Sequence, residues 1–241
     1  MIPQNHGGDI FDALERLAEV EDEMAMQNKF YFGLDLGQSA DFSALAIIER
    51  QKRESMSFEP VYHCRHLQRW PLRTSYPTIV ADTVRMVSSG HVQKGMIEPT
   101  LAVDSTGVGA PVVDLFKRER MRADLMPIQI TGGDSVTREH GMTRVPKRDL
   151  VSTAQVYLQS GRLKIAPELP DAPTLVRELE NFQVKISLDT AHDSYGVWRE
   201  GSHDDLVLSV CLALWMGVES ESRTPTHQTN WLRQNSIGDG E

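Results

Sequence analysis

Short apolar runs bounded by polar or glycine-containing turns dominate the first half of the chain. Residues 29–36 (KFYFGLDL) and 42–49 (FSALAIIE) are two such runs, separated by the short loop GQSAD, which predicts an antiparallel hairpin. Further runs of this kind predict additional short strands. These strand candidates are 61–67, 100–104 (TLAVD), 125–130 and 163–165.

Apolar residues at helical spacing alternate with the later strand candidates. Segment 147–160 predicts a helix closed by Gly161, and the strongly apolar segment 202–216 predicts the last helix. Residues 184–188 and 195–198 favour a second hairpin. The other helix candidates are 9–26, 74–88, 111–120 and 175–182. An initial hairpin followed by alternating strands and helices predicts a mixed α/β sheet with helices on both faces. An RNase H-like arrangement fits this order, and so does an actin-like half-domain.

The two ends of the chain differ from its middle. Residues 1–28 predict an acidic amphipathic helix with Ile10, Leu14 and Leu17 near one face, whereas residues 219–241 are polar, lack periodicity and favour a tail. We therefore expect one domain at 29–218, flanked by an N-terminal packing or partner helix and a C-terminal tail.

The composition is that of an ordinary globular protein, and it excludes several classes of protein. Of the 241 residues, 40% are hydrophobic and 24% are charged, and only two are cysteines. Two distant cysteines exclude a disulfide framework and a cysteine-based zinc finger. No apolar run is long enough to span a membrane, so we expect no membrane partner. The net charge of −9 divides into −6 for residues 1–28, −2 for residues 219–241 and −1 for the middle. Charge therefore neither supports nor excludes a nucleic-acid partner.

Carboxylates occur where an apolar pattern makes them costly. Asp35 lies inside an apolar strand, Asp104 ends another strand before a glycine-rich turn, and Asp204 and Asp205 open the last helix. A buried carboxylate needs a cation, a metal or hydrogen-bond donors. Two strand-borne carboxylates and one from a helix could converge on Mg²⁺ or Mn²⁺. Two such ions, bridged by Asp35, could activate water and stabilise a leaving oxygen. His203 is a possible auxiliary ligand or proton shuttle.

Each of these residues also has a purely structural interpretation. Asp35 could serve the turn at Gly37, Asp104 could cap the following helix, and Asp205 could close a capping box with Ser202. Only their combination favours a metal site.

Basic residues and glycines supply weaker indications of phosphate binding. Lys147 and Arg148 open a helix, where positive charge opposes the helix dipole, so they favour either a phosphate contact or solvent exposure. Arg138 and Arg144 lie in the polar stretch 131–146, which favours a mobile, basic loop facing DNA. Gly107 and Gly109 permit a tight turn that could bind phosphate. The chain contains no P-loop, HExxH or GxSxG motif.

Four segments together resemble a known family. FGLDLGQSADFSALAIIE, LAVDSTGVGAPVVDLF, VPKRDLVSTAQVYLQSGRLKI and SHDDLVLSVCLALW, in this order and spacing, resemble the nuclease domain of the large terminase subunit of tailed bacteriophages. The resemblance covers about 29–218. It implies an RNase H-like fold and metal-dependent endonuclease cleavage of double-stranded DNA during genome packaging, with two Mg²⁺ or Mn²⁺ ions.

The resemblance also implies roles for individual residues. Asp35 would match the metal ligand of the first strand and Asp104 the ligand of the later strand. At least one of Asp204 and Asp205 would bind metal, with Asp205 slightly favoured. Lys147 and Arg148 would match a basic segment beside the site.

One departure from the family concerns the ATPase domain that usually precedes the nuclease. Only 28 residues precede the first strand, so we expect an isolated domain, a split-gene product or a prophage remnant, working in the host cytoplasm. Its expected partners are double-stranded DNA and a separate packaging ATPase, portal or small terminase subunit. The competing hypotheses are a non-catalytic DNA-binding or assembly module, a Holliday-junction resolvase, and an actin-like ATPase or sugar kinase.

Overall fold

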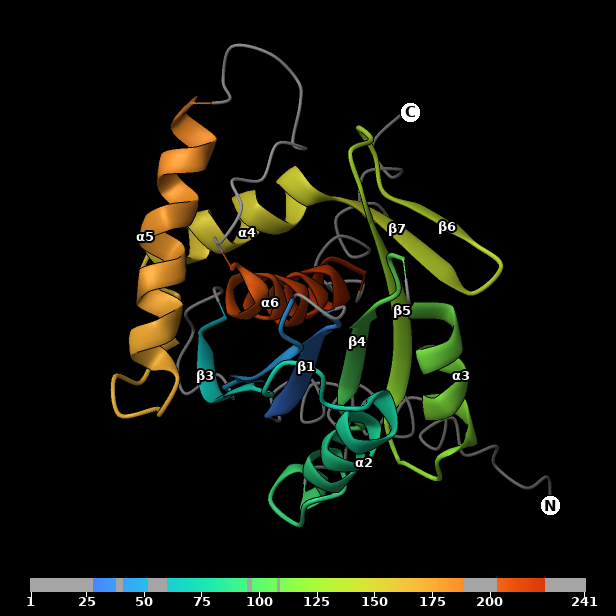
Figure 1. Ribbon diagram of the computed structural model, residues 1–241. Coiled ribbons are helices and arrows are strands. Elements are labelled where there is room, and N and C mark those ends of the chain that lie inside the picture. The colour runs from blue at the N-terminus through green and yellow to red at the C-terminus, as the bar shows by residue number, and fades with distance from the viewer. Residues whose placement is uncertain are drawn as a thin grey trace, which may run out of the picture.

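A mixed eight-stranded sheet forms the centre of the computed structural model, which describes residues 28–37, 41–51, 60–94, 97–107, 109–188 and 203–223. Its strand order is β6-β7-β5-β4-β1-β2-β3-β8 (Figure 1). The strands are β1 (Lys29–Asp35), β2 (Ala44–Arg50), β3 (Tyr62–Arg69), β4 (Thr100–Asp104), β5 (Asp124–Thr131), β6 (Thr137–Glu139), β7 (Met142–Pro146) and β8 (Leu163–Ile165).

The pairing of these strands is antiparallel in the first hairpin and parallel beyond it. β1 pairs antiparallel with β2, and β2 with β3, whereas β4, β5 and β7 continue the sheet from β1 in parallel. This confirms the predicted hairpin and the mixed RNase H-like sheet. Because β1, β3, β4, β5 and β7 all run the same way, their carboxyl ends share one edge of the sheet.

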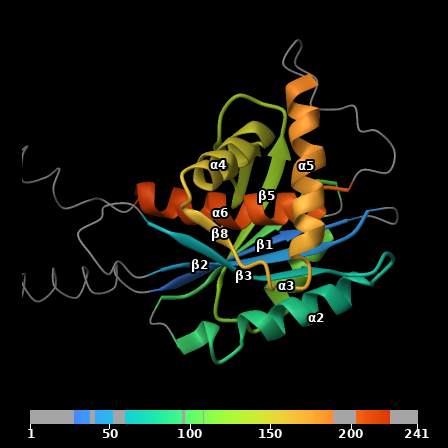
Figure 2. The ribbon, with the colours of Figure 1, turned by 90° about the vertical axis from the view of Figure 1, so that its left-hand side faces the viewer.

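Helices cover both faces of the sheet (Figure 2). α4 (Lys147–Gln159), α5 (Ala172–Leu188) and α6 (Asp205–Arg223) lie on one side, and α2 (Tyr76–Val87) and α3 (Gly109–Arg118) on the other, with a short 3-10 helix η1 (Val92–Lys94) after α2. The alternation of β1 divides the core accordingly, since successive side chains of a strand point to opposite faces. Phe32 and Leu34 pack with the α2 and α3 side, whereas Tyr31 packs with the α4 to α6 side.

Helix α6 lies directly against the sheet because glycine stands at two points of contact. A Cβ added at Gly33 would lie 2.6 Å from the backbone nitrogen of Ala213, and still closer to the carbonyl oxygen of Ser209. A Cβ at Gly217 would lie 2.5 Å from the ring of Tyr62. These close approaches set the position of α6 on the sheet, and therefore the place of its N-terminus relative to the end of β1.

Two predicted elements are wrong. Residues 184–188 belong to α5 and not to a strand. Hydrophobic and polar residues alternate here over too few positions to distinguish the period of a strand from that of a helix. Extending an existing helix adds a hydrogen bond for each residue. The stretch 131–146, expected to be a mobile loop, contains the β6–β7 hairpin, which turns at His140 and Gly141, both at positive φ.

The last helix also extends beyond its expected end, to Arg223, and so includes the first residues of the expected tail. Contacts with the sheet hold this end: the hydroxyls of Tyr31 and Ser220 lie 2.7 Å apart, and Arg50 pairs with Glu221 at 3.0 Å. The expected helix 9–26, the strand 195–198 and residues 224–241 lie outside the described residues.

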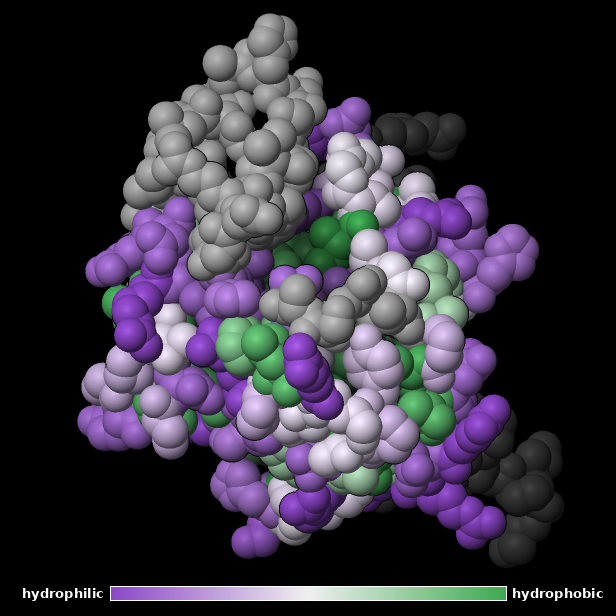
Figure 3. Space-filling model, in the orientation of Figure 1, coloured by the Kyte–Doolittle hydropathy of each residue, from purple (hydrophilic) through white to green (hydrophobic). Residues whose placement is uncertain are grey.

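The surface seen in Figure 3 is mostly hydrophilic, and its hydrophobic residues form small, separate patches. Of the helices in the described segments, none combines the length and hydropathy that a membrane crossing needs.

Candidate active site

Asp35 and Asp104 meet at the edge where the parallel strands end. Asp35 is the last residue of β1 and Asp104 the last residue of β4, and the parallel pairing of Leu34 with Val103 brings the two carboxyl groups together. Both side chains are buried, and the charge of Asp104 raises the pKa of Asp35. Two buried carboxyl groups this close together disfavour each other's charged form, and a nearby cation would relieve that effect.

The N-terminus of α6 brings two more carboxylates to this edge. The carbonyl of Asp204 accepts the first helical bond, from the N–H of Leu208 at 2.9 Å, which makes Asp204 the N-cap, and Asp205 is the first helical residue. Both side chains are buried. The structure thus brings together the four carboxylates that the sequence singled out.

Lys147 joins the same cluster. It is the first residue of α4, and its Nζ lies 3.4 Å from Oδ2 of Asp204 and 5.6 Å from the centre of the Phe182 ring. Burial lowers the pKa of Lys147, and the charges of Asp204 and Asp35 oppose that shift. The lysine, expected to contact DNA or solvent, therefore supplies positive charge to the carboxylates.

The carboxylates affect one another strongly. Burial raises the pKa of Asp35 well above its ordinary value, and the charges of Asp104, Asp205 and Asp204 raise it further. Burial also raises the pKa of Asp104, although its hydrogen bonds with Thr106 oppose the shift. Burial and the charges of Glu178 and Asp204 raise the pKa of Asp205 to about 7. The cluster therefore has more negative charge than Lys147 can balance.

Asp205 presents an unsatisfied acceptor. Within the described part of the chain, its Oδ2 is buried and has no hydrogen-bond partner. Nδ1 of His203 is 3.7 Å from this oxygen, and the His203 ring packs edge-on against Phe42. The sequence placed His203 beside the site, and the structure puts it next to Asp205.

The donor chemistry of this cluster suits a hard divalent cation, because all four groups offer carboxylate oxygens. Such a cation would supply a partner for the buried oxygen of Asp205 and would favour the charged forms of Asp35 and Asp104. As the side chains stand, no three His, Cys, Asp or Glu residues within the described ranges form a group that could hold a metal ion. Metal binding would therefore require side-chain rearrangement.

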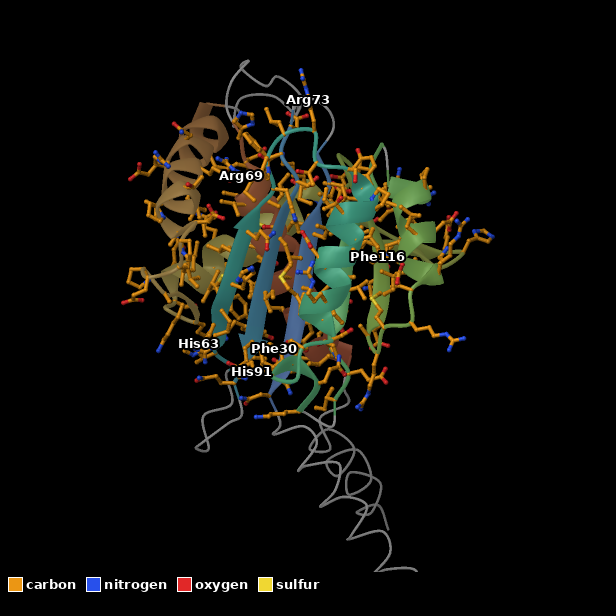
Figure 4. All side chains as sticks on the ribbon, turned by 60° about the horizontal axis from the view of Figure 1, so that its bottom comes forward. Phe30, His63, Arg69, Arg73, His91 and Phe116 are labelled. Carbon is orange, nitrogen blue, oxygen red and sulfur yellow. The ribbon has the colours of Figure 1, made fainter. Side chains whose placement is uncertain are left out.

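Two residues that the sequence analysis did not single out lie behind the carboxylates. Glu178 of α5 is buried, and it accepts hydrogen bonds from the N–H groups of Leu206 and Val207. Arg69, the last residue of β3, pairs with Glu178 at 3.1 Å. Figure 4 shows Arg69 at the opposite end of the sheet from Phe30, which lies near the start of β1. A glutamate on the apolar face of a helix, between Leu175 and Phe182, was the sequence signal for Glu178.

The arginines expected to bind DNA are paired with acidic groups. Arg138 pairs with Glu219, Arg144 with Glu139, and Arg148 with Asp134. Arg138 and Arg144 belong to the β6–β7 hairpin, and Arg148 to the first turn of α4. Their role in DNA binding stays a prediction.

The turn after β4 is bound to the aspartate that precedes it. The Asp104 carboxylate accepts a hydrogen bond from the N–H of Thr106 at 2.8 Å, and Gly107 adopts a positive φ of 78°. Asp104 therefore shapes this turn and also faces the cluster, so its structural and functional interpretations do not exclude each other.

Comparison with solved structures finds a similar fold in a terminase nuclease domain. The nuclease domain of the human cytomegalovirus terminase, soaked with Mn and bound to an inhibitor, matches with a TM-score of 0.51 and 14% identity, over 78% of this chain and 82% of that one. The chain has the fold of a terminase nuclease domain. This confirms the fold expected from the four sequence segments.

Two bacteriophage structures match with TM-scores of 0.46. They are the large terminase nuclease of the thermophilic phage G20c (16% identity, 77% of this chain and 81% of that one) and the terminase nuclease domain of phage SPP1 with bound Mn (15% identity, 81% and 90%). No family model and no curated protein sequence matches this chain.

Proposed function

We propose that this protein is a divalent-metal-dependent endonuclease that hydrolyses double-stranded DNA. The observation that supports it is the cluster of Asp35, Asp104, Asp204 and Asp205, which are buried together at the carboxyl edge of an RNase H-like sheet. Burying several carboxylates together is unfavourable without a cation, so their convergence favours a binding role over a structural one.

Asp35, Asp104 and Asp205, with Asp204 beside them, would hold Mg²⁺ or Mn²⁺. When bound, the metal lowers the pKa of a coordinated water and stabilises charge on the scissile phosphate. Asp35 and Asp104 would have to be ionised to act as ligands, so metal binding would be linked to the release of any proton that they carry. Lys147 holds Asp204 in place from the side of α4 and keeps positive charge near the substrate phosphate.

The approach of DNA to this edge would use sequence-independent contacts to phosphates. Arg73, exposed on the turn after β3 with a φ of 67°, lies at the same end of the sheet as Arg69 in Figure 4. Affinity carried by such contacts falls steeply with salt concentration. In the cell, we place this activity in viral genome packaging in the host cytoplasm, beside a separate packaging ATPase, portal or small terminase subunit.

A plasmid cleavage assay tests the proposal. Wild-type protein is incubated with supercoiled plasmid and Mg²⁺, Mn²⁺ or EDTA, beside Asp35→Asn and the control Asp114→Asn, which changes an exposed carboxylate of α3. We expect metal-dependent nicking or linearisation by wild type and the control, and none by Asp35→Asn.

Other outcomes identify the competing hypotheses. Binding of DNA without cleavage under any metal would indicate a non-catalytic assembly module. Preference for four-way junctions over linear duplex would indicate a resolvase. A thermal shift with ATP but not with Mn²⁺ would indicate a nucleotide-binding protein.

A further inference from the structure

The first turn of α6 receives its cap from another helix. The N–H groups of Leu206 and Val207, at the second and third helical positions, both donate to Oε2 of Glu178, at 2.9 and 3.2 Å. The side chain of the N-cap residue usually fills this role. Here the N-cap is Asp204, a member of the carboxylate cluster, and its Oδ2 lies 3.4 Å from Lys147.

Glu178 is itself held in place. Its second oxygen, Oε1, accepts a hydrogen bond from the guanidinium of Arg69 at 3.1 Å. The backbone N–H of Arg69 donates to Asp171, just before α5, at 3.2 Å, so this residue links the end of β3 to α5 at two points. The Arg69 guanidinium also lies 4.1 Å from the centre of the Phe42 ring, and Phe42 packs against His203.

We propose that Glu178 and Arg69 form a positioning bracket, which caps α6 from α5 and thereby sets the place of Asp204 and Asp205 for metal binding. This inference rests on the proposed function. Glu178 acts through the backbone of α6 and is a positioning residue, not a ligand, because its Oε2 accepts the two N–H groups and its Oε1 accepts from Arg69.

Two substitutions of Glu178 distinguish the effect of its side-chain length from the effect of its negative charge. Glu178→Asp keeps the negative charge but shortens the side chain, so the carboxylate no longer reaches the N–H groups of Leu206 and Val207. Glu178→Gln keeps an oxygen at the cap and loses the charge. Loss of groups that orient metal ligands typically weakens metal affinity about 10- to 100-fold, and we expect that loss for Glu178→Asp and a smaller one for Glu178→Gln.

The experiment measures Mn²⁺ affinity by electron paramagnetic resonance and amide hydrogen exchange at Leu206 and Val207 in the full chain. Glu180→Ala, an exposed change on the same helix, is the surface control. Leu175→Ala removes a fully buried side chain of α5 that donates no hydrogen bond to the cap, and it controls for general destabilisation. We expect both controls to bind Mn²⁺ as wild type does, and we expect faster exchange at the two amides only in Glu178→Asp.

The order of the affinities decides the outcome. Weaker binding by Glu178→Gln than by Glu178→Asp would show that charge matters and positioning does not, and equal binding by both variants and wild type would also overturn the bracket. A wild-type protein that neither binds Mn²⁺ nor cleaves DNA would contradict the proposed function itself, which the wild-type measurement reveals before any variant is compared.

Discussion

Replacing Asp35 by asparagine is expected to stabilise the metal-free protein while abolishing cleavage. Asp35 is buried among Asp104, Asp204 and Asp205, and burial together with their charges raises its pKa well above the ordinary value. Asparagine has nearly the same shape, carries no charge and can donate an N–H to the carboxylate of Asp104. The substitution therefore removes an electrostatic cost without opening a cavity.

The size of this effect follows from linkage between protonation and folding. Each pKa unit corresponds to about 1.4 kcal/mol, and full burial raises the pKa of a carboxyl by up to about 3–5 units, so for an ordinary pKa of 3.8 the cost at about pH 7.5 is at most about 5 kcal/mol. Lys147 offsets part of this cost by lowering the pKa. We expect Asp35→Asn to raise the free energy of unfolding by about 2–4 kcal/mol in EDTA.

The pH dependence identifies the cause. A carboxyl whose pKa is raised in the folded state destabilises the protein above its unfolded pKa, and this cost disappears as the pH falls towards that value. The stability difference between Asp35→Asn and wild type should thus be largest at about pH 8 and close to zero at about pH 4.

Urea unfolding in EDTA across this range measures the difference, with Asp114→Asn as the control, which should stay within about 0.5 kcal/mol of wild type. The reasoning is refuted if Asp35→Asn is less stable than wild type at about pH 7.5, or if its advantage does not shrink in acid.

Two further substitutions test how the site is supported. Gly33→Ala places a methyl group 2.6 Å from the backbone nitrogen of Ala213, so we expect α6 to shift and stability to fall by about 1–3 kcal/mol or more, measured by urea unfolding. Unchanged stability would show that α6 does not lie as close to β1 as described. Lys147→Gln removes the cation beside Asp204, and we expect a lower stability in EDTA and at least about tenfold slower cleavage. A variant that cleaves at the wild-type rate would exclude a role for this charge in the reaction.

Most of the strands and the four carboxylates could be predicted because both leave local signals. An alternating or continuous apolar run identifies a strand from neighbouring residues alone, and β1, β2 and β4 were found in this way. Asp35 and Asp104 interrupt such runs at their carboxyl ends, where an ionisable group is costly, so their positions were visible without knowledge of the partners.

The hairpin β6–β7 and the end of α5 could not be predicted, because neither leaves such a local signal. The three residues of β6 are all exposed and polar, so no apolar pattern marks them, and the strand exists through its backbone pairing with β7. In α5, the last residues alternate in hydrophobicity over too few positions to distinguish a strand from the continuation of a helix.

The residues that support the site could not be predicted from the sequence, because their roles depend on contacts between distant segments of the chain. Glu178 reaches the backbone of α6 across 28 and 29 residues, and Arg69 reaches Glu178 across 109. The sequence reveals where an acid is costly, because that depends on its immediate neighbours, but not what compensates the cost. Glu178 is informative because it is itself a buried acid, yet two N–H groups and a guanidinium offset part of its burial cost. Oδ2 of Asp205 accepts no hydrogen bond among the described residues, and its neighbour is Nδ1 of His203 at 3.7 Å. This difference between two buried carboxylates is the reason why we propose positioning for Glu178 and metal binding for Asp205.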